Sequence, residues 1–171
     1  MDMLRRLLGK KHDPLMERAD TLVQMANVNA VGAFTPMLGE FPLLRETDTE
    51  NWDFILTVAG VFMAATRLRN LRVGEAREQK LMNVVYERFT GWDAKNGIWA
   101  FEDCKSFFAS NFDTLTKRGH EPQFVASDAI GLWIVWNVLG RAPQSEKEGS
   151  LVRTVGVLVT HAFFNWWDEN A

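Results

Sequence analysis

The chain has 171 residues, a net charge of −3, 47% hydrophobic residues and 24% charged residues, which are ordinary values for one globular domain. No segment has the basic excess of a nucleic-acid-binding protein, and the longest apolar runs fall well short of the roughly 20 residues that span a bilayer. We therefore expect a soluble protein with no nucleic-acid partner and no transmembrane segment.

Cysteine usage and aromatic content bound the protein further. Cys104 is the only cysteine, so neither an internal disulfide nor a cysteine zinc cage can form. Together with the lack of a secretory signal, this favours a cytoplasmic location. The 12 Phe and 7 Trp predict a core built from bulky rings.

Residues 1–12 form a short basic arm. Pairs of apolar residues are followed by pairs of basic residues along the arm, which makes residues 3–11 amphipathic. Two interpretations stay open for this arm: contact with a membrane surface or a partner, and docking on its own domain or fraying as a terminus.

A first helix is predicted from Pro14 to about Phe34, because Asp13-Pro14 is a helix start and apolar residues then recur at helical spacing. The prolines and glycine between Thr35 and Glu46 argue against a regular helix there and predict an ordered crossover. The capping box at Thr47–Glu50 then opens a helix over about 48–72, which is apolar nearly all round in its middle.

Four more helices follow, and no segment has a convincing strand pattern. The helix start and stop signals given by Gly, Pro and capping residues place these helices at about 75–89, 98–117, 122–140 and from 146 onward. The sequence thus predicts an all-α, single-domain helical bundle of six or seven helices over 13–171. The helices at about 48–72 and 122–140 are nearly all-apolar and are expected at its centre.

Motifs for chemistry are missing from the sequence. It contains no Gly-x-Ser-x-Gly, no phosphate-binding glycine loop and no Glu-x-x-His pair, so we expect no cofactor and no metal, and we favour a non-catalytic protein. Outside the arm, the one concentration of basic residues can either clamp an anion or act as a solvated helix end, and both interpretations stay open. It consists of Arg67, Arg69, Arg72 and Arg77.

Three adjacent aromatic pairs give the main functional prediction. They are Phe107-Phe108, Phe163-Phe164 and Trp166-Trp167. Neighbouring residues on a helix point about 100° apart, so burying both members of a pair requires cover on two sides. We therefore predict a protein-binding or self-associating protein, with Phe107, Phe164 and Trp167 as contacts to another chain.

The alternative prediction is an enzyme or carrier with a small-molecule cleft beside helix 122–140. Its polar groups would be Asp128, Asn137 and His161. If these three side chains meet in one pocket, the alternative gains support. If they are scattered and hydrogen-bonded elsewhere, they are packing contacts.

Overall fold

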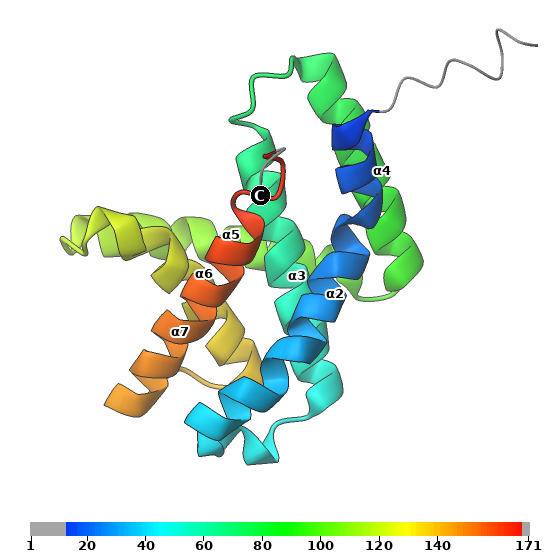
Figure 1. Ribbon diagram of the computed structural model, residues 1–171. Helices are drawn as coiled ribbons and strands as arrows, with labels where there is room; N and C mark the ends of the chain where they lie inside the picture. The colour runs from blue at the N-terminus through cyan, green and yellow to red at the C-terminus, as the bar shows by residue number, and fades with distance from the viewer. Residues whose placement is uncertain (1–12, 169–171) are drawn as a thin grey trace, which may run out of the picture.

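The computed structural model describes residues 13–168, and within this range the protein is all-helical with no strand. The arm at 1–12, with its proposed membrane contact, lies outside the described residues. No helix in 13–168 combines the length and apolarity needed to cross a membrane. The elements are α2 (Pro14–Glu40), the 3₁₀ helix η1 (Pro42–Glu46), α3 (Thr49–Leu68), α4 (Glu75–Trp92), α5 (Gly97–Lys117), α6 (Pro122–Leu139) and α7 (Glu146–Phe163) (Figure 1).

Helix α2 begins as its sequence predicts but runs further. The Asp13 carboxylate accepts from the backbone N–H of Met16 at 3.3 Å and so caps the first turn. The predicted end at Phe34 is wrong, because the helix continues to Glu40 with Pro36 inside it. Pro36 removes its own N–H bond and crowds the carbonyl of residue 32, but Met37, one residue on, is buried in the core and holds the helix in place. The expected non-helical crossover therefore shrinks to the short η1.

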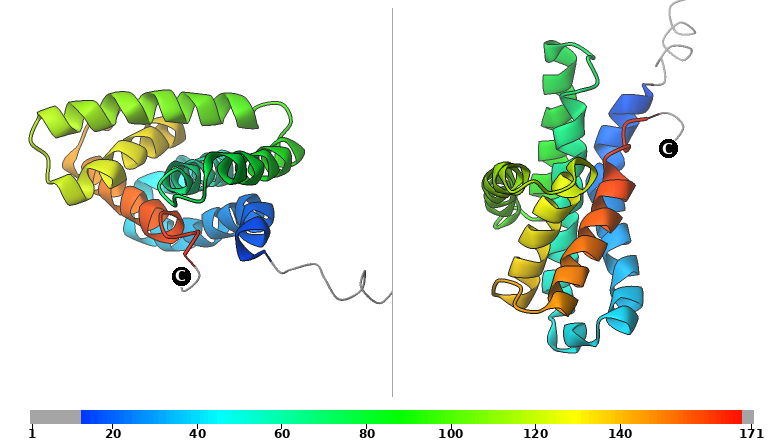
Figure 2. Two further views of the ribbon diagram at one scale, coloured as in Figure 1. Left: turned by 90° about the horizontal axis from the view of Figure 1, so that it is seen from above. Right: turned by 90° about the vertical axis from the view of Figure 1, so that its left-hand side faces the viewer.

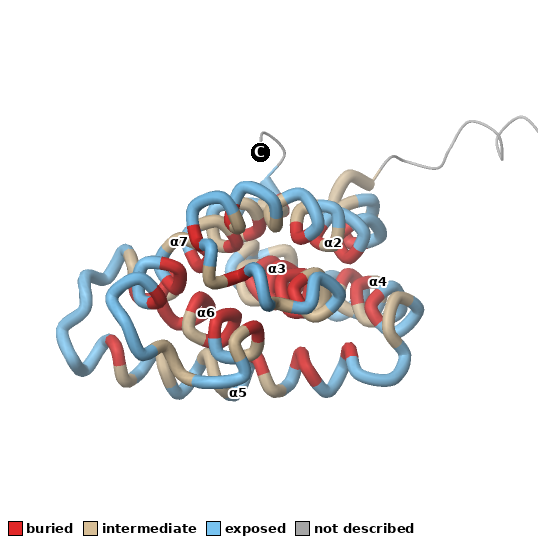
Figure 3. Tube along the Cα trace, turned by 90° about the horizontal axis from the view of Figure 1, so that it is seen from below, coloured by how far each residue is buried: buried red, intermediate tan, exposed pale blue. Residues whose placement is uncertain are grey.

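Helix α3 is the most enclosed element. Thirteen of its 20 residues are buried, and it packs against α2, α5, α6 and α7. Views from above and below show three layers, with α2 and α7 on one side, α3, α4 and α6 in the middle, and α5 crosswise on the other side (Figures 2 and 3). The predicted central helix at 48–72 is therefore α3, although it ends at Leu68 and not at residue 72.

Helix α6, the second expected central helix, is buried on most but not all of its surface. Ten of its 18 residues are buried, against α5, α7 and α3, while Trp136 stays 45% exposed. Its bounds agree with the predicted start and stop residues, since Pro122 begins the helix and Gly140 ends it in the left-handed conformation at φ 68°. Helix α6 therefore lies in the middle layer and has one outward edge.

The turn after α7 closes the core against two earlier helices. The indole Nε1 of Trp167 donates to the carbonyl oxygen of Ala64 in α3 at 2.8 Å. The indole Nε1 of Trp166 donates to the carbonyl oxygen of Arg18 in α2 at 3.1 Å, and the Arg18 guanidinium donates back to the Trp166 carbonyl. These bonds fasten the end of α7 to both neighbours.

Candidate interaction surface

Trp167 does not serve as an exposed anchor for another chain. Its side chain is 2% exposed and is hydrogen-bonded within the core. The expectation that Trp166 and Trp167 compete for burial assumed that both lie on a helix. Helix α7 ends at Phe163, so both rings lie in a turn, where each can point to its own partner. The prediction for Trp167 is therefore wrong.

The other two aromatic pairs are also covered largely by this chain. Phe164 is half-buried beneath the guanidinium of Arg67, whose carbon lies 5.0 Å from the ring centre. Phe107 is half-buried and meets the ring of Trp136 edge-on, with centroids 5.9 Å apart. Of the three predicted anchors, Phe107 and Phe164 are partly exposed, and only Trp167 is withdrawn into the core.

Asp128, Asn137 and His161 do not meet at one site. Asp128 is 6% exposed and binds both Nε and Nη2 of Arg153 in α7, the second at 2.6 Å. The Asn137 amide donates to the Trp133 carbonyl of its own helix, and His161 is exposed on α7. Sequence reasoning missed Arg153 because its partner lies 25 residues away. These residues act as packing contacts and as surface, so the small-molecule alternative loses its predicted polar groups.

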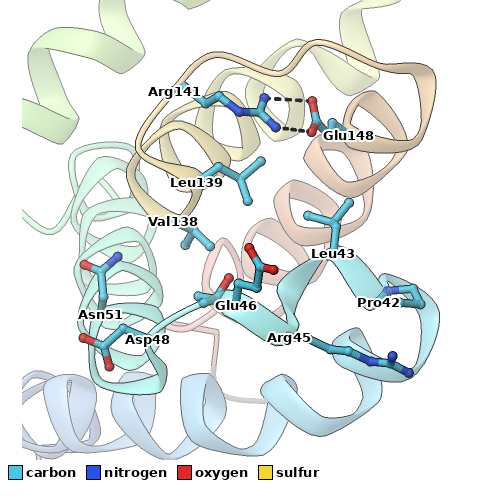
Figure 4. A pocket seen from close by; sticks show the side chains of 11 residues that line it. Pro42, Leu43, Arg45, Glu46, Asp48, Asn51, Val138, Leu139, Arg141 and Glu148 are labelled. Atoms are coloured by element: carbon cyan, nitrogen blue, oxygen red, sulfur yellow. Dashed lines mark hydrogen bonds and ion pairs between the residues drawn. The ribbon is translucent and has the colours of Figure 1, made fainter.

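A hollow of about 580 Å³ does lie beside the end of α6, with different residues (Figure 4). Arg141 and Glu148 close one side of it through two hydrogen bonds of 2.6 and 3.1 Å. These bonds and the Gln144 N–H lower the pKa of Glu148 to about 2. The lining comes from η1, the start of α3 and the α6–α7 turn: Pro42, Leu43, Arg45, Glu46, Thr47, Asp48, Asn51, Val138, Leu139, Arg141 and Glu148.

The predicted arginine concentration does not form one anion clamp. Arg67 lies over Phe164, and Arg77 donates to Asp13 at 2.9 Å. Arg69 has its nearest carboxylate, that of Glu78, at 4.0 Å. The group thus separates into individual contacts with different partners.

Cys104 is fully buried on the inner side of α5. Burial, and secondarily the charge of Asp103, raise the pKa of its thiol well above the ordinary value. Among the described residues no group of three or more His, Cys, Asp and Glu side chains could hold a metal ion.

The predicted cytoplasmic location stays a prediction.

The most unusual surface is the outward face of α2. Residues 21–39 contain no ionisable side chain, which is the longest such run in the chain. The next two runs, 54–66 and 129–140, belong mainly to the buried helices α3 and α6. In α2 the run lies on a helix at the surface, where Met25, Val28 and Val31 are 44%, 57% and 54% exposed. We call this outward side, residues 21–39, the α2 face.

Two glycines on the α2 face have no packing role within the chain. A Cβ added to Gly32 or Gly39 would meet no atom within 4 Å. At Gly131 and Gly156, by contrast, a Cβ would collide with the backbone of the facing helix. A glycine inside a helix costs about 0.5–1 kcal/mol of stability relative to alanine. Gly32 and Gly39 therefore destabilise α2, and no close contact within the monomer compensates for this loss.

Six of the nine exposed residues of the α2 face follow a regular spacing. Steps of four and three alternate along Thr21, Met25, Val28, Gly32, Thr35 and Gly39, and the other three, Gln24, Val31 and Pro36, flank this line. This is the spacing of a seam between two packed helices. The charge-free run is visible in the sequence, but its meaning depends on which side of the helix faces the core.

Comparisons with known proteins identified no relative of this chain. A scan against protein-family models, a search of curated proteins and a search of solved structures each found no match for this chain. The functional assignment therefore rests on the geometry of the described residues.

Proposed function

We propose that this protein is a non-catalytic, self-associating helical protein whose α2 face pairs with the same face of a second copy. The observation that carries the proposal is a 19-residue, charge-free run on an exposed helix, with Met25, Val28 and Val31 in contact with solvent. Apolar residues exposed together on one face are typical of interaction surfaces. A two-fold dimer uses one patch on both subunits, so a single such face is sufficient.

An antiparallel pairing centred on residue 30 would match the α2 face to itself. In that register Met25 lies opposite Thr35 of the second copy, and Val28 lies opposite Gly32 of the second copy. Each large side chain then faces a small one, and the exposed glycines let the two backbones approach closely. This is the use that Gly131 and Gly156 have inside the chain.

Electrostatics would favour the same register. The two faces bring no charges into opposition, and antiparallel helices align their dipoles favourably. At each end, Glu40 of one copy would lie opposite Asp20 of the other, and Arg88, whose exposed guanidinium lies 2.6 Å from Asp20, would offset these two like charges. The face is only about 28 Å long at ~1.5 Å per residue. A contact of this size is small for a specific interface, so we expect a dissociation constant in the micromolar range.

Sedimentation equilibrium over a wide range of protein concentration tests the proposal. The wild-type chain should pass from monomer to dimer as the concentration rises. Val28→Glu should weaken the dimer at least about tenfold, because it places two like charges near the symmetry axis. The matched control is Val157→Glu on α7, since Val157 is 41% exposed but belongs to a different helix.

Two outcomes would overturn the proposal. One is a strict monomer at every concentration reached. The other is a dimer that Val28→Glu and Val157→Glu weaken equally, which would move the interface elsewhere. Circular dichroism of both variants checks that neither substitution unfolds the chain.

A further inference from the structure

A second surface feature lies in a different part of the molecule, in the groove between α3, α4 and α5. The groove has a volume of about 290 Å³, near the lower limit for small-ligand sites. The α2 face belongs to the opposite outer layer from α5 (Figure 3). The groove therefore stands independently of the proposed dimer. Its lining residues are Phe62, Ala65, Thr66, Arg69, Met82, Tyr86, Phe101, Lys105, Phe108 and Ala109.

Aromatic rings in mutual contact form the wall of the groove. Phe62 in α3 meets Phe101 and Phe108 in α5 edge-on, with ring centroids 5.8 and 5.1 Å apart. Tyr86 in α4 meets Phe101 at 5.8 Å in the same manner. Because these rings are fixed by one another, the groove is largely preformed, and an apolar group entering it would not have to order the wall.

The polar groups of the groove have one sign of charge. Arg69 and Lys105 line it, and none of its lining residues is acidic. Each cation does have a carboxylate outside the groove: Glu102 lies 3.1 Å from Lys105, and Glu78 lies 4.0 Å from Arg69. The Lys105–Glu102 pair is solvent-exposed and the Arg69–Glu78 pair is long, so both are weak and leave the cations available to an incoming anion.

We propose that this groove binds a small apolar monocarboxylate, with the hydrocarbon part against the aromatic wall and the carboxylate at Lys105 and Arg69. The apolar wall supplies affinity through burial, and the two cations select the anionic end. A neutral molecule with the same hydrocarbon part would bind less tightly. A cationic one would bind less tightly still, since the lining holds two cations and their nearby carboxylates, those of Glu78 and Glu102, are already paired with them.

Calorimetric titration with octanoate and 1-octanol, which share a similar hydrocarbon tail, tests the proposal. Octanoate should bind about tenfold more tightly than 1-octanol, and Lys105→Ala should remove most of that difference. The matched control is Lys117→Ala. Lys117 is also an exposed lysine of α5 paired with an acid on its own helix, Asp113, but it does not line the groove.

A blocking variant separates the groove from other apolar surfaces. Ala109 is exposed and lines the groove, so Ala109→Trp should fill the groove without disturbing the core and should abolish octanoate binding. Three results would overturn the proposal: no octanoate binding by the folded wild-type protein, equal affinity for octanoate and 1-octanol, or binding that Ala109→Trp leaves unchanged. None of these results bears on the dimer, because its measurement uses neither ligand nor groove variants.

Discussion

Gly131 and Gly156 lie face to face where α6 crosses α7: a Cβ on Gly156 would lie 3.3 Å from the Cα of Gly131 and would collide with the Ser127 carbonyl. Gly156→Ala should therefore force the two helices apart. We expect a loss of about 1–3 kcal/mol or more in unfolding free energy, and a melting temperature lower by about 2–4 °C per kcal/mol. Urea and thermal unfolding followed by circular dichroism measure both quantities.

The control for this substitution is Gly149→Ala on the same helix. Gly149 is exposed, and an added Cβ would meet no atom within 4 Å. Because alanine is the better helix former, Gly149→Ala should stabilise the protein by up to about 1 kcal/mol. If the two substitutions change stability in the same direction, the close crossing of α6 and α7 is not as described.

Trp167 should behave as a core residue. Trp167→Ala removes a buried ring and leaves the Ala64 carbonyl without its indole donor, so we expect a loss of about 3–5 kcal/mol in unfolding free energy. Trp99, which is 72% exposed, serves for comparison, and Trp99→Ala should change stability by no more than about 0.5 kcal/mol. A small effect of Trp167→Ala would restore this residue as a surface contact.

The Arg141–Glu148 pair should make stability depend on acid pH. Two hydrogen bonds from Arg141, helped by the Gln144 N–H, lower the pKa of Glu148 to about 2 from an ordinary 4.5. The unfolded chain thus binds a proton first as the pH falls. The resulting stabilisation is present above about pH 4.5 and is lost as the pH falls towards about 2.

Thermal unfolding between neutral pH and about pH 2 measures this dependence. Glu148→Gln should lower the melting temperature at neutral pH, and its difference from the wild type should shrink across the acid window. Glu146→Gln, an exposed neighbour in the first turn of α7, is the control. A constant difference between Glu148→Gln and the wild type would contradict the pKa of Glu148.

Cys104 should not react with thiol reagents while the protein is folded. The side chain is fully buried, and burial raises the pKa of its thiol, so both access and thiolate are suppressed. Ellman's reagent at about pH 8 should modify no thiol in the native protein and one thiol per chain in denaturant. Rapid modification of the native protein would mean that α5 opens readily from the core.

Most helix boundaries could be predicted because they depend on residues close together in the chain. The cap at Asp13, the start at Pro122 and the stop at Gly140 each act within one helical turn. The prediction that the helix ends before Pro36 was wrong, because the effect of a proline inside a helix depends on tertiary packing. The burial of Met37 and Leu44 holds the chain in place through Pro36 and into η1.

The candidate surface could not be predicted, because it depends on which side of α2 is covered. The charge-free run at 21–39 is plain in the sequence, yet the same pattern in α3 belongs to a buried helix. Only the packing of α2 against α3 and α4 shows that Met25 and Val28 lie outward. The adjacent pair Trp166-Trp167 was predicted to need cover from another chain because both residues were placed on a helix. The two residues lie in a turn, so each indole forms a hydrogen bond within this chain.

The mutual hydrogen bonds of Arg18 and Trp166 connect residues that are 148 positions apart. A contact that closes so long a loop gains nothing until the intervening helices are in place, so it belongs to the last steps of folding. The same contact is a natural place for partial opening, because releasing it separates α2 from the turn after α7 while Trp167 stays bonded to Ala64 and the crossing of α6 and α7 stays intact. The contact between Arg18 and the turn after α7 would then be among the last parts of the protein to form and among the first to open.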